Sequence, residues 1–584
     1  MKFKNHGFTF TVLYFRLAHR MKTIRKIFYK YCLFLFWSLP IPILGQSFEG
    51  YVSPLDIPIA VSGTFSEYRK THFHAGLDMR TNGEKGLNIY SVSGGWVSRI
   101  RVSTSGYGKV LYITHDDGYM AVYAHLDKFS DVIQKFVKHH QYAKKQFEVD
   151  LYLEKNSIPI SVGELIGYSG NTGSSLGPHL HFEIRNPKNV PVNPLKLPYF
   201  VGDTIPPVIS EIMIYSHLDD GLYRQRLDFE ETDFPHKLYW VDSVQALGPI
   251  SLGIQMHDRS NLSANVNGVY SVDLIKQDQS IFRYQFDQIQ FSDRNYINLM
   301  IDYPLYRLEN QRIQRLFKHP LNDVSVWEDL TDGIIHIQEK DSVPIKLVIK
   351  DHHQNMSVIK MNIIGGPPQN NLTNVYPIHE NGISINQSES YQFDFDAIQV
   401  EFPKNTFFDD VVLDIQQWNQ TIDLGTDSLA VNNSLKISFA LNSLQLENKQ
   451  QFFIAKLRDN EQEPSFISAY KEGNHISTRI KELGTYTILR DQSPPIIEPI
   501  NIHEGKNMEQ EKDIQLRVGD DNGSISSYHG AIDGQWVLFE YESKEDLLIF
   551  DFSDIELSTG EHLLEISVED KVGNQTKTSI NFII

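Results

Sequence analysis

Residues 170–184 read Gly170-Asn-Thr-Gly-Ser-Ser-Leu-Gly-Pro-His179-Leu-His181-Phe-Glu-Ile184, a glycine-rich turn followed by alternating polar and apolar residues. Glycine and proline disfavour a helix in the approach, so the segment after them is predicted to be a strand. Side chains of a strand point alternately to opposite faces, which places His179 and His181 on one face. Leu180 and Phe182 then point to the other face, where they can join a core. Two imidazoles on a rigid strand are suited to a metal site.

The histidine pair alone is also compatible with two hydrogen-bonded side chains on a half-buried strand. A second motif favours the metal interpretation: Thr71-His-Phe-His74-Ala-Gly-Leu-Asp78-Met has a histidine and a carboxylate four residues apart. In an extended chain this even spacing places both on one face. A catalytic zinc ion needs three protein ligands and one open position. His74, Asp78 and one histidine of the later pair would supply the three.

A third motif, Ala121-Val-Tyr123-Ala-His125-Leu126, lies between the first two and adds another histidine after a β-prone run. The order His-x-Gly-x-Asp, Tyr-x-His-Leu and Gly-Pro-His-Leu-His-Phe-Glu resembles the lysostaphin and LytM type of zinc endopeptidase, which cuts peptidoglycan peptides. The resemblance runs from about residue 54 to about residue 194, and several motifs in the same order are more specific than any single one.

The resemblance implies a function and a set of site residues. It implies that His74, Asp78 and His181 bind Zn²⁺ and that His125 and His179 are the catalytic pair beside it. The function expected from it is zinc-dependent hydrolysis of peptide bonds in peptidoglycan, in cross-links or stem peptides. The alternative is a non-catalytic envelope protein that binds the cell wall or activates a hydrolase. No ligand position is substituted, which favours the enzyme.

The chain is predicted to be mainly β and to hold several domains, because 584 residues exceed the usual size of one. The resemblance implies an antiparallel β peptidase domain. The segment 130–146 interrupts the β pattern with apolar residues at helical spacing and is predicted to be an inserted helix that Ser130 could cap. A strand over 147–153 should follow. The helix could form a wall of the substrate groove or pack on the flank of the domain, and its His139 and His140 are expected to be solvated.

The first 45 residues contain eight Lys and Arg, no Asp or Glu, and an apolar run over 31–44. This pattern is typical of a secretory signal peptide, with Met21 as an alternative start. Its Pro40 and Pro42 argue against a membrane anchor, so no span is expected in the mature chain. We therefore expect export to the periplasm, the cell envelope or the extracellular space. The only cysteine, Cys32, lies in this leader, which excludes disulfides and thiol catalysis elsewhere.

The whole chain is acidic, with a formal net charge of -19. Loss of the leader would make the mature chain more acidic still, so nucleic acid is not an expected partner. Peptidoglycan peptides remain compatible with this charge, since they carry both amines and carboxylates.

The remainder of the chain is β-rich and internally repeated. Asp203-Thr-Ile-Pro-Pro207 returns as Asp491-Gln-Ser-Pro-Pro495, and the order of other aspartate-containing strand ends is repeated as well. These repeats predict two immunoglobulin-like β-sandwiches with a further β domain between them. We expect no ligand cluster in this part, although its aspartates could bind calcium between modules. A partner protein of the envelope could bind here.

The predicted organisation is a signal peptide over 1–45, a peptidase domain over 46–202, and β domains over 203–366, 367–490 and 491–584. Four further residues have less specific roles. His72 and His115 are expected near the metal site as structural partners rather than ligands. Asn171 and Tyr123 could orient substrate or serve the turn and the core.

Overall fold

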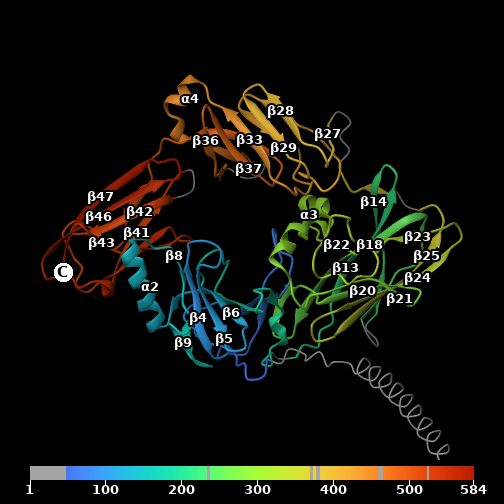
Figure 1. The fold of residues 1–584 in the computed structure, drawn as a ribbon, viewed down its shortest axis with the longest axis horizontal. Coiled ribbons are helices and arrows are strands. Elements are labelled where there is room, and N and C mark those ends of the chain that lie inside the picture. The colour runs from blue at the N-terminus through green and yellow to red at the C-terminus, as the bar shows by residue number, and fades with distance from the viewer. Residues whose placement is uncertain are drawn as a thin grey trace, which may run out of the picture. The chain divides into compact units, whose positions relative to one another are not determined.

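The computed structural model describes residues 48–200, 202–232, 237–368, 372–376, 382–457, 464–521 and 525–584. The predicted signal peptide, with Cys32 and Met21, lies outside them. As predicted, the described chain is mainly β, with several β-sheet modules after the domain that carries the histidine motifs (Figure 1). No helix within these ranges has both the length and the apolar character needed to cross a bilayer.

The histidine-bearing domain is built on one antiparallel sheet with the strand order β1-β2-β11-β6-β5-β4-β8, and on a smaller sheet with the order β3-β10-β7. Its strands are β1 (Val61–Gly63), β2 (Leu77–Arg80), β3 (Asn88–Tyr90), β4 (Gly95–Val102), β5 (Lys109–His115), β6 (Met120–Leu126), β7 (Lys128–Phe129), β8 (Val149–Tyr152), β9 (Pro159–Ile160), β10 (Leu165–Tyr168), β11 (His179–Arg185) and β12 (Pro191–Val192). The central position of β11, between β2 and β6, makes it the strand on which the site is assembled.

Strand β11 confirms the predicted alternation. Leu180, Phe182 and Ile184 are fully buried on one face. Phe182 packs against the ring of Tyr123, with a centroid distance of 5.4 Å. Burial of each such side chain stabilises the fold by about 1.5–3 kcal/mol, so the core fixes which face of β11 carries the histidines.

The inserted helix is α2 (Asp131–Lys144). Ile133 and Val137 are buried, and the helix contacts β7 and β8. Strand β8 is at the edge of the sheet, on the side away from β2. This placement agrees with packing on the flank. Ser130 occupies the N-cap position, but its side chain makes no capping bond, so that part of the prediction is wrong. The backbone N–H of Gln134 instead donates to the Ser130 carbonyl.

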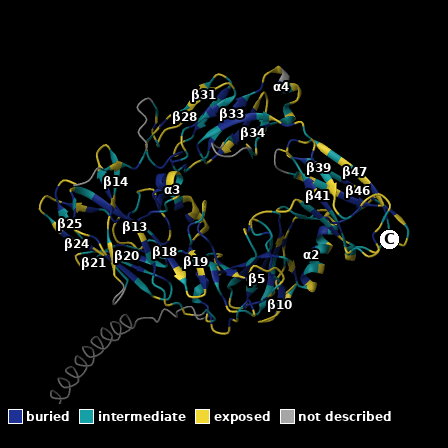
Figure 2. Ribbon diagram, turned by 180° about the vertical axis from the view of Figure 1, so that it is seen from behind, coloured by how far each residue is buried: buried dark blue, intermediate teal, exposed yellow. Residues whose placement is uncertain are grey.

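The first module after this domain contains two sheets with the orders β19-β18-β13-β14-β26 and β15-β16-β25-β24-β20-β21. Its elements are β13 (Val208–Leu218), β14 (Gly221–Leu227), β15 (Glu230–Thr232), β16 (Lys237–Trp240), β17 (Val244–Ala246), β18 (Gly248–Ser260), β19 (Ser263–Asn267), β20 (Ser271–Lys276), β21 (Gln279–Gln285), α3 (Tyr303–Glu309), β22 (Gln314–Arg315), β23 (Ile335–Ile337), β24 (Ser342–Lys350), β25 (Met356–Gly365) and β26 (Thr373–Asn374). Figure 2 shows the buried residues lying along the strands of the sheets.

The middle module also has two main sheets, with the orders β28-β29-β33-β37-β36 and β31-β32-β38-β34-β35, which share one apolar core. Its elements are β27 (Ile383–Ile385), β28 (Tyr391–Phe395), β29 (Ile398–Phe402), β30 (Val411–Leu413), β31 (Gln416–Trp418), β32 (Thr421–Asp423), β33 (Leu435–Ala440), α4 (Ser443–Glu447), β34 (Phe452–Leu457), β35 (Ser465–Ile467), β36 (Tyr470–Glu472), β37 (His475–Ile480) and β38 (Thr485–Arg490).

The last module repeats the two-sheet plan around its own core, with the orders β39-β41-β45-β44 and β40-β47-β46-β42-β43. Its strands are β39 (Ile496–Pro499), β40 (Lys506–Asn507), β41 (Asp513–Gly519), β42 (Ile525–Ile532), β43 (Gln535–Trp536), β44 (Glu540–Glu542), β45 (Leu547–Asp551), β46 (Glu561–Asp570) and β47 (Gln575–Ile583). Each pair of sheets buries the apolar faces of its strands against the other, as in β-sandwiches.

A close backbone contact joins the first histidine motif to β11. A Cβ atom added at Gly76 would lie 2.3 Å from the carbonyl oxygen of Phe182. We therefore expect Gly76→Ala to lower the free energy of unfolding of this domain by about 1–3 kcal/mol, because the loop before β2 must move away from β11. Thermal unfolding followed by circular dichroism measures the change. Gly177→Ala is the matched control, since a Cβ there would meet nothing within 4 Å. Equal stability of the two variants would contradict the prediction.

Candidate metal centre

The pairing register of β2 with β11 brings two of the predicted ligands together. Asp78 is the direct cross-strand partner of His181. Side chains of directly opposed residues lie on the same face and within contact distance. His181 Nδ1 is 2.9 Å from Asp78 Oδ1.

His74 reaches the same point from outside the strand. It lies in the loop before β2, which begins at Leu77, so the prediction of one extended segment over 74–78 is wrong. The loop nevertheless places His74 Nε2 3.0 Å from Asp78 Oδ1 and 3.1 Å from His181 Nδ1. Ligand atoms of His74, Asp78 and His181 all lie within 4.8 Å of one another.

The remaining ring nitrogens of the two histidines determine where their protons lie. His74 Nδ1 is 2.7 Å from the carbonyl oxygen of Thr64, and His181 Nε2 is 3.0 Å from Glu183 Oε1. Carbonyl and carboxylate oxygens only accept, so these nitrogens carry the hydrogens. In the neutral rings, His74 Nε2 and His181 Nδ1 therefore present lone pairs toward the same carboxylate oxygen. Two lone pairs and one anionic oxygen form a donor set that fits a cation such as Zn²⁺.

The electrostatics of the cluster agree with this donor set. Burial alone would lower the pKa of His181, but its hydrogen bonds to Asp78 and Glu183 raise that pKa to about 9. Burial opposes ionisation of Asp78 too, yet the charge of His74 and hydrogen bonds from His179 and His181 hold its pKa well below its usual range. The site therefore stabilises positive charge beside Asp78, and a metal ion can replace the proton on His181.

Arg69 is a further residue of the site that was not predicted. Its Nη2 atom donates to Asp78 Oδ2 at 2.8 Å, so the second carboxylate oxygen of Asp78 is bound while Oδ1 faces the histidines. This contact orients the carboxylate for a single-oxygen ligand. Arg69 lies in a loop nine residues before Asp78, and nothing in its local sequence marks it.

His125 reaches the site because β6 is irregular at that point. The pairing of β6 with β5 is shifted opposite residues 109–111, which forms a β-bulge, and His125 has a left-handed φ of 60°. Ala124 is the register partner of His181, so a regular strand would direct His125 to the opposite face. Bulges commonly redirect side chains beside active sites. Here the His125 ring centroid lies 4.9 Å from that of His179 and 5.8 Å from that of His181.

His125 and His179 are held in the same way. His125 Nδ1 donates to the carbonyl oxygen of Thr172 at 2.8 Å, and His179 Nδ1 donates to that of Gly177 at 2.8 Å. Each ring therefore directs Nε2 toward the site, where His179 Nε2 lies 3.3 Å from Asp78 Oδ1. Burial and the neighbouring His181 and His179 lower the pKa of His125 to about 3, so its ring is neutral at physiological pH. A neutral imidazole such as that of His125 can accept a proton at Nε2.

The other residues singled out from the sequence lie outside the ligand cluster. His115 is buried, and its Nδ1 atom donates to the carbonyl of Gly94, while His72 Nδ1 lies 3.2 Å from the hydroxyl oxygen of Thr71. Tyr123 is fully buried, and its hydroxyl accepts from the backbone N–H of Val92, which is a core role. On α2, His139 is exposed and His140 is half-buried.

Glu183 supports the predicted metal ligand His181 from the buried side. It is fully buried, accepts from Arg185 Nε at 2.7 Å and also accepts from the hydroxyl of Tyr107. Although burial opposes it, the charge of Arg185 lowers the pKa of Glu183 to about 2, with help from His181. A carboxylate behind a ligating histidine fixes its tautomer and increases its basicity.

We expect Glu183→Gln to weaken zinc affinity by about 10- to 100-fold, because the neutral amide no longer increases the basicity of His181. Competition with a chromophoric chelator measures the dissociation constant. Tyr107→Phe is the control, since it removes a neighbouring hydrogen bond to Glu183 but leaves the His181 contact in place. An unchanged affinity in Glu183→Gln would show that this carboxylate does not tune the ligand.

Comparison with known families agrees with the geometry. The family described as peptidase family M23 matches residues 72–148 and 152–194, the segments that contain all five residues of the site. The chain carries a peptidase family M23 domain. A second family, described as a Zu5-like domain, matches residues 369–491.

Three curated proteins show similarity to part of the chain. An uncharacterized metalloprotease of Haemophilus influenzae is 32% identical over 26% of this chain and 28% of its own length. The DD-carboxypeptidase/endopeptidase Mpg of Neisseria meningitidis serogroup B is 31% identical over 21% and 22%. The peptidoglycan DD-endopeptidase ShyA of Vibrio cholerae is 28% identical over 31% and 37%. The chain thus spans well under two thirds of the length of each relative.

Proposed function

We propose that this protein is a zinc-dependent endopeptidase that hydrolyses peptide bonds of peptidoglycan in the cell envelope. The observation that carries the proposal is the convergence of His74 Nε2, Asp78 Oδ1 and His181 Nδ1, with the protons of both rings held on their far nitrogens. The M23 domain and the peptidoglycan endopeptidase among its relatives support the choice of substrate.

The chain's own residues would do most of the chemistry. A bound zinc ion would supply Lewis-acid activation of water and of the scissile carbonyl. His125 and His179 present Nε2 atoms beside the ligand cluster, each with its Nδ1 proton fixed on a backbone carbonyl. One of them can accept the proton of the attacking water, and the other can stabilise the developing oxyanion. Their fixed rings require little reorganisation as the reaction proceeds.

The alternative function, a wall-binding or hydrolase-activating protein without catalysis, needs none of these five side chains. Their joint presence therefore favours the enzyme. We further propose that the chain is exported and that its β-sheet modules, which we interpret as immunoglobulin-like and Zu5-like, contact the wall or an envelope partner.

We expect the zinc-loaded chain to release soluble muropeptides from purified sacculi, with cleavage in the peptides and intact glycan. Treatment with a chelator should reduce release to the level without enzyme, and added zinc should restore it, because the ligands hold the ion reversibly. Mass spectrometry of the products identifies the bond that is cut. If the zinc-loaded chain sediments with sacculi but releases nothing, the binding function replaces the catalytic one.

A further inference from the structure

The repeated sequences of the first and last modules fold into the same turn. Between β24 and β25, the backbone N–H of Asn355 donates to Asp351 Oδ1 at 2.9 Å, and its side-chain amide donates to Asp351 Oδ2 at 2.6 Å. Between β46 and β47, Asn574 makes the same two bonds to Asp570, at 2.9 and 2.8 Å. In both turns the aspartate is held rigidly in place.

A second aspartate lies beside each turn, at the segment that enters the module. Asp203 Oδ1 accepts from the backbone N–H of Ile205 at 3.1 Å, and Asp491 Oδ1 accepts from that of Ser493 at 3.0 Å. The side chain of Asn355 also donates to the Asp203 carbonyl, at 2.8 Å. The entering segment and the turn are therefore joined.

A third aspartate comes from another strand end in each module. Asp258 lies near the end of β18 in the first module, and Asp520 directly follows β41 in the last. Potential ligand atoms lie within 4.8 Å of one another in two groups: Asp203, Asp351 and His353, and Asp491, Asp520 and Asp570. The expectation that the tail lacks a ligand cluster is therefore wrong. The members of each cluster come from separate strand ends, so no short sequence motif predicts them.

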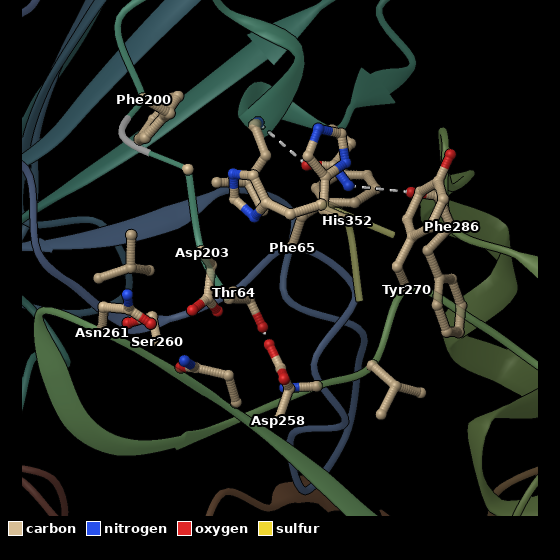
Figure 3. A pocket seen from close by; sticks show the side chains of 18 of the residues that line it. Thr64, Phe65, Phe200, Asp203, Asp258, Ser260, Asn261, Tyr270, Phe286 and His352 are labelled. Carbon is tan, nitrogen blue, oxygen red and sulfur yellow. Dashed lines mark hydrogen bonds between the residues drawn. The ribbon is translucent and has the colours of Figure 1, made fainter. Parts of the chain in front are cut away.

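A buried carboxyl oxygen without a hydrogen-bond partner lies in the pocket beside the first group. Asp258 is 7% exposed, and its Oδ1 atom makes no hydrogen bond. It lines the same pocket as Asp203 (Figure 3). His353 is also part of the lining of that pocket. Among the described residues, no lysine or arginine forms an ion pair with Asp203, Asp258 or Asp351. A buried carboxyl group without a basic partner either keeps its proton or needs a cation to neutralise its charge.

We propose that the first and last modules each bind one calcium ion through these aspartate clusters. Carboxylate oxygens are hard ligands that favour Ca²⁺ or Mg²⁺ over transition metals. The last cluster offers only oxygen atoms as ligands. Mg²⁺ requires a near-ideal octahedral arrangement, whereas the larger Ca²⁺ tolerates the irregular arrangement of ligands from separate strand ends. In each module the ion would tie the entering segment to two strand ends.

Calorimetric titration of the full zinc-loaded chain with Ca²⁺ tests the proposal. We expect two ions per chain, and saturating Ca²⁺ should raise the Tm of the modules by at least about 3 °C relative to EGTA. Asp258→Asn should abolish one site and Asp520→Asn the other. The shape of the side chain is kept in both variants. Asp219→Asn, at an exposed turn outside both clusters, is the matched control and should bind two ions.

Three results would overturn the proposal. These are the absence of calcium-dependent heat and Tm shift, unchanged stoichiometry in both cluster variants, and an equal response to Mg²⁺ at the same concentration. Circular dichroism in EGTA identifies any variant that fails to fold, and Asp203→Asn or Asp491→Asn then replaces it. Calcium binding is measured independently of peptidoglycan hydrolysis, so the outcome does not depend on the proposed function.

Discussion

His181→Ala is expected to lose bound zinc and hydrolysis of sacculi together. His181 is the proposed ligand on the central strand β11, and its Nδ1 atom lies within 3.1 Å of both His74 Nε2 and Asp78 Oδ1. A zinc site with two protein ligands left has too few donors for a stable catalytic ion. Zinc content should fall from about one ion per chain to the background level, and muropeptide release should become undetectable.

The measurement pairs elemental analysis of the purified variant with the sacculus assay. His72→Ala is the matched control, because His72 lies two residues before His74, is exposed, and belongs to no ligand group. It should retain zinc and activity. Because His181 also contacts buried Glu183, circular dichroism must show that the variant keeps its β signal. A folded His181→Ala protein that still holds stoichiometric zinc would exclude His181 as a ligand.

The sequence contained enough information to predict β11 and the face on which its histidines lie. Alternation of apolar and polar residues over 179–184 is a local property, and the core formed by Leu180 and Phe182 preserves it. The helix over 131–144 was predictable for the same reason, since its apolar spacing is local. The family motifs identified the other site residues without indicating how they meet.

The parts that the sequence did not reveal depend on pairing between distant segments. The register of β2 with β11 places Asp78 opposite His181, and a shift by one residue would separate them. The bulge that redirects His125 depends on how β5 pairs with β6. Arg69 acts through a loop conformation, and the aspartate clusters of the tail assemble from separate strand ends. None of these has a local sequence signal.

His179→Ala and His125→Ala are expected to keep zinc but to lose about 10²- to 10⁴-fold of kcat, the usual contribution of a general acid or base. Neither residue belongs to the group of converging ligand atoms. Their Nδ1 atoms bond backbone carbonyls at 2.8 Å, so each ring contributes only Nε2 to the site. Stopped assays with a soluble cross-linked muropeptide give kcat, and elemental analysis gives the zinc content.

Comparing the two variants distinguishes a loss of catalysis from a distortion of strand β11. His179 lies two residues from His181 on β11, so its loss could affect the metal indirectly, whereas His125 lies on β6. If both variants retain zinc and lose activity, the common cause is the missing Nε2 atom. The double variant should then lose less than the product of the two single losses, because residues that act in one step are not additive. A zinc-free but folded His179→Ala protein would instead make His179 a ligand and reverse the assignment within the pair.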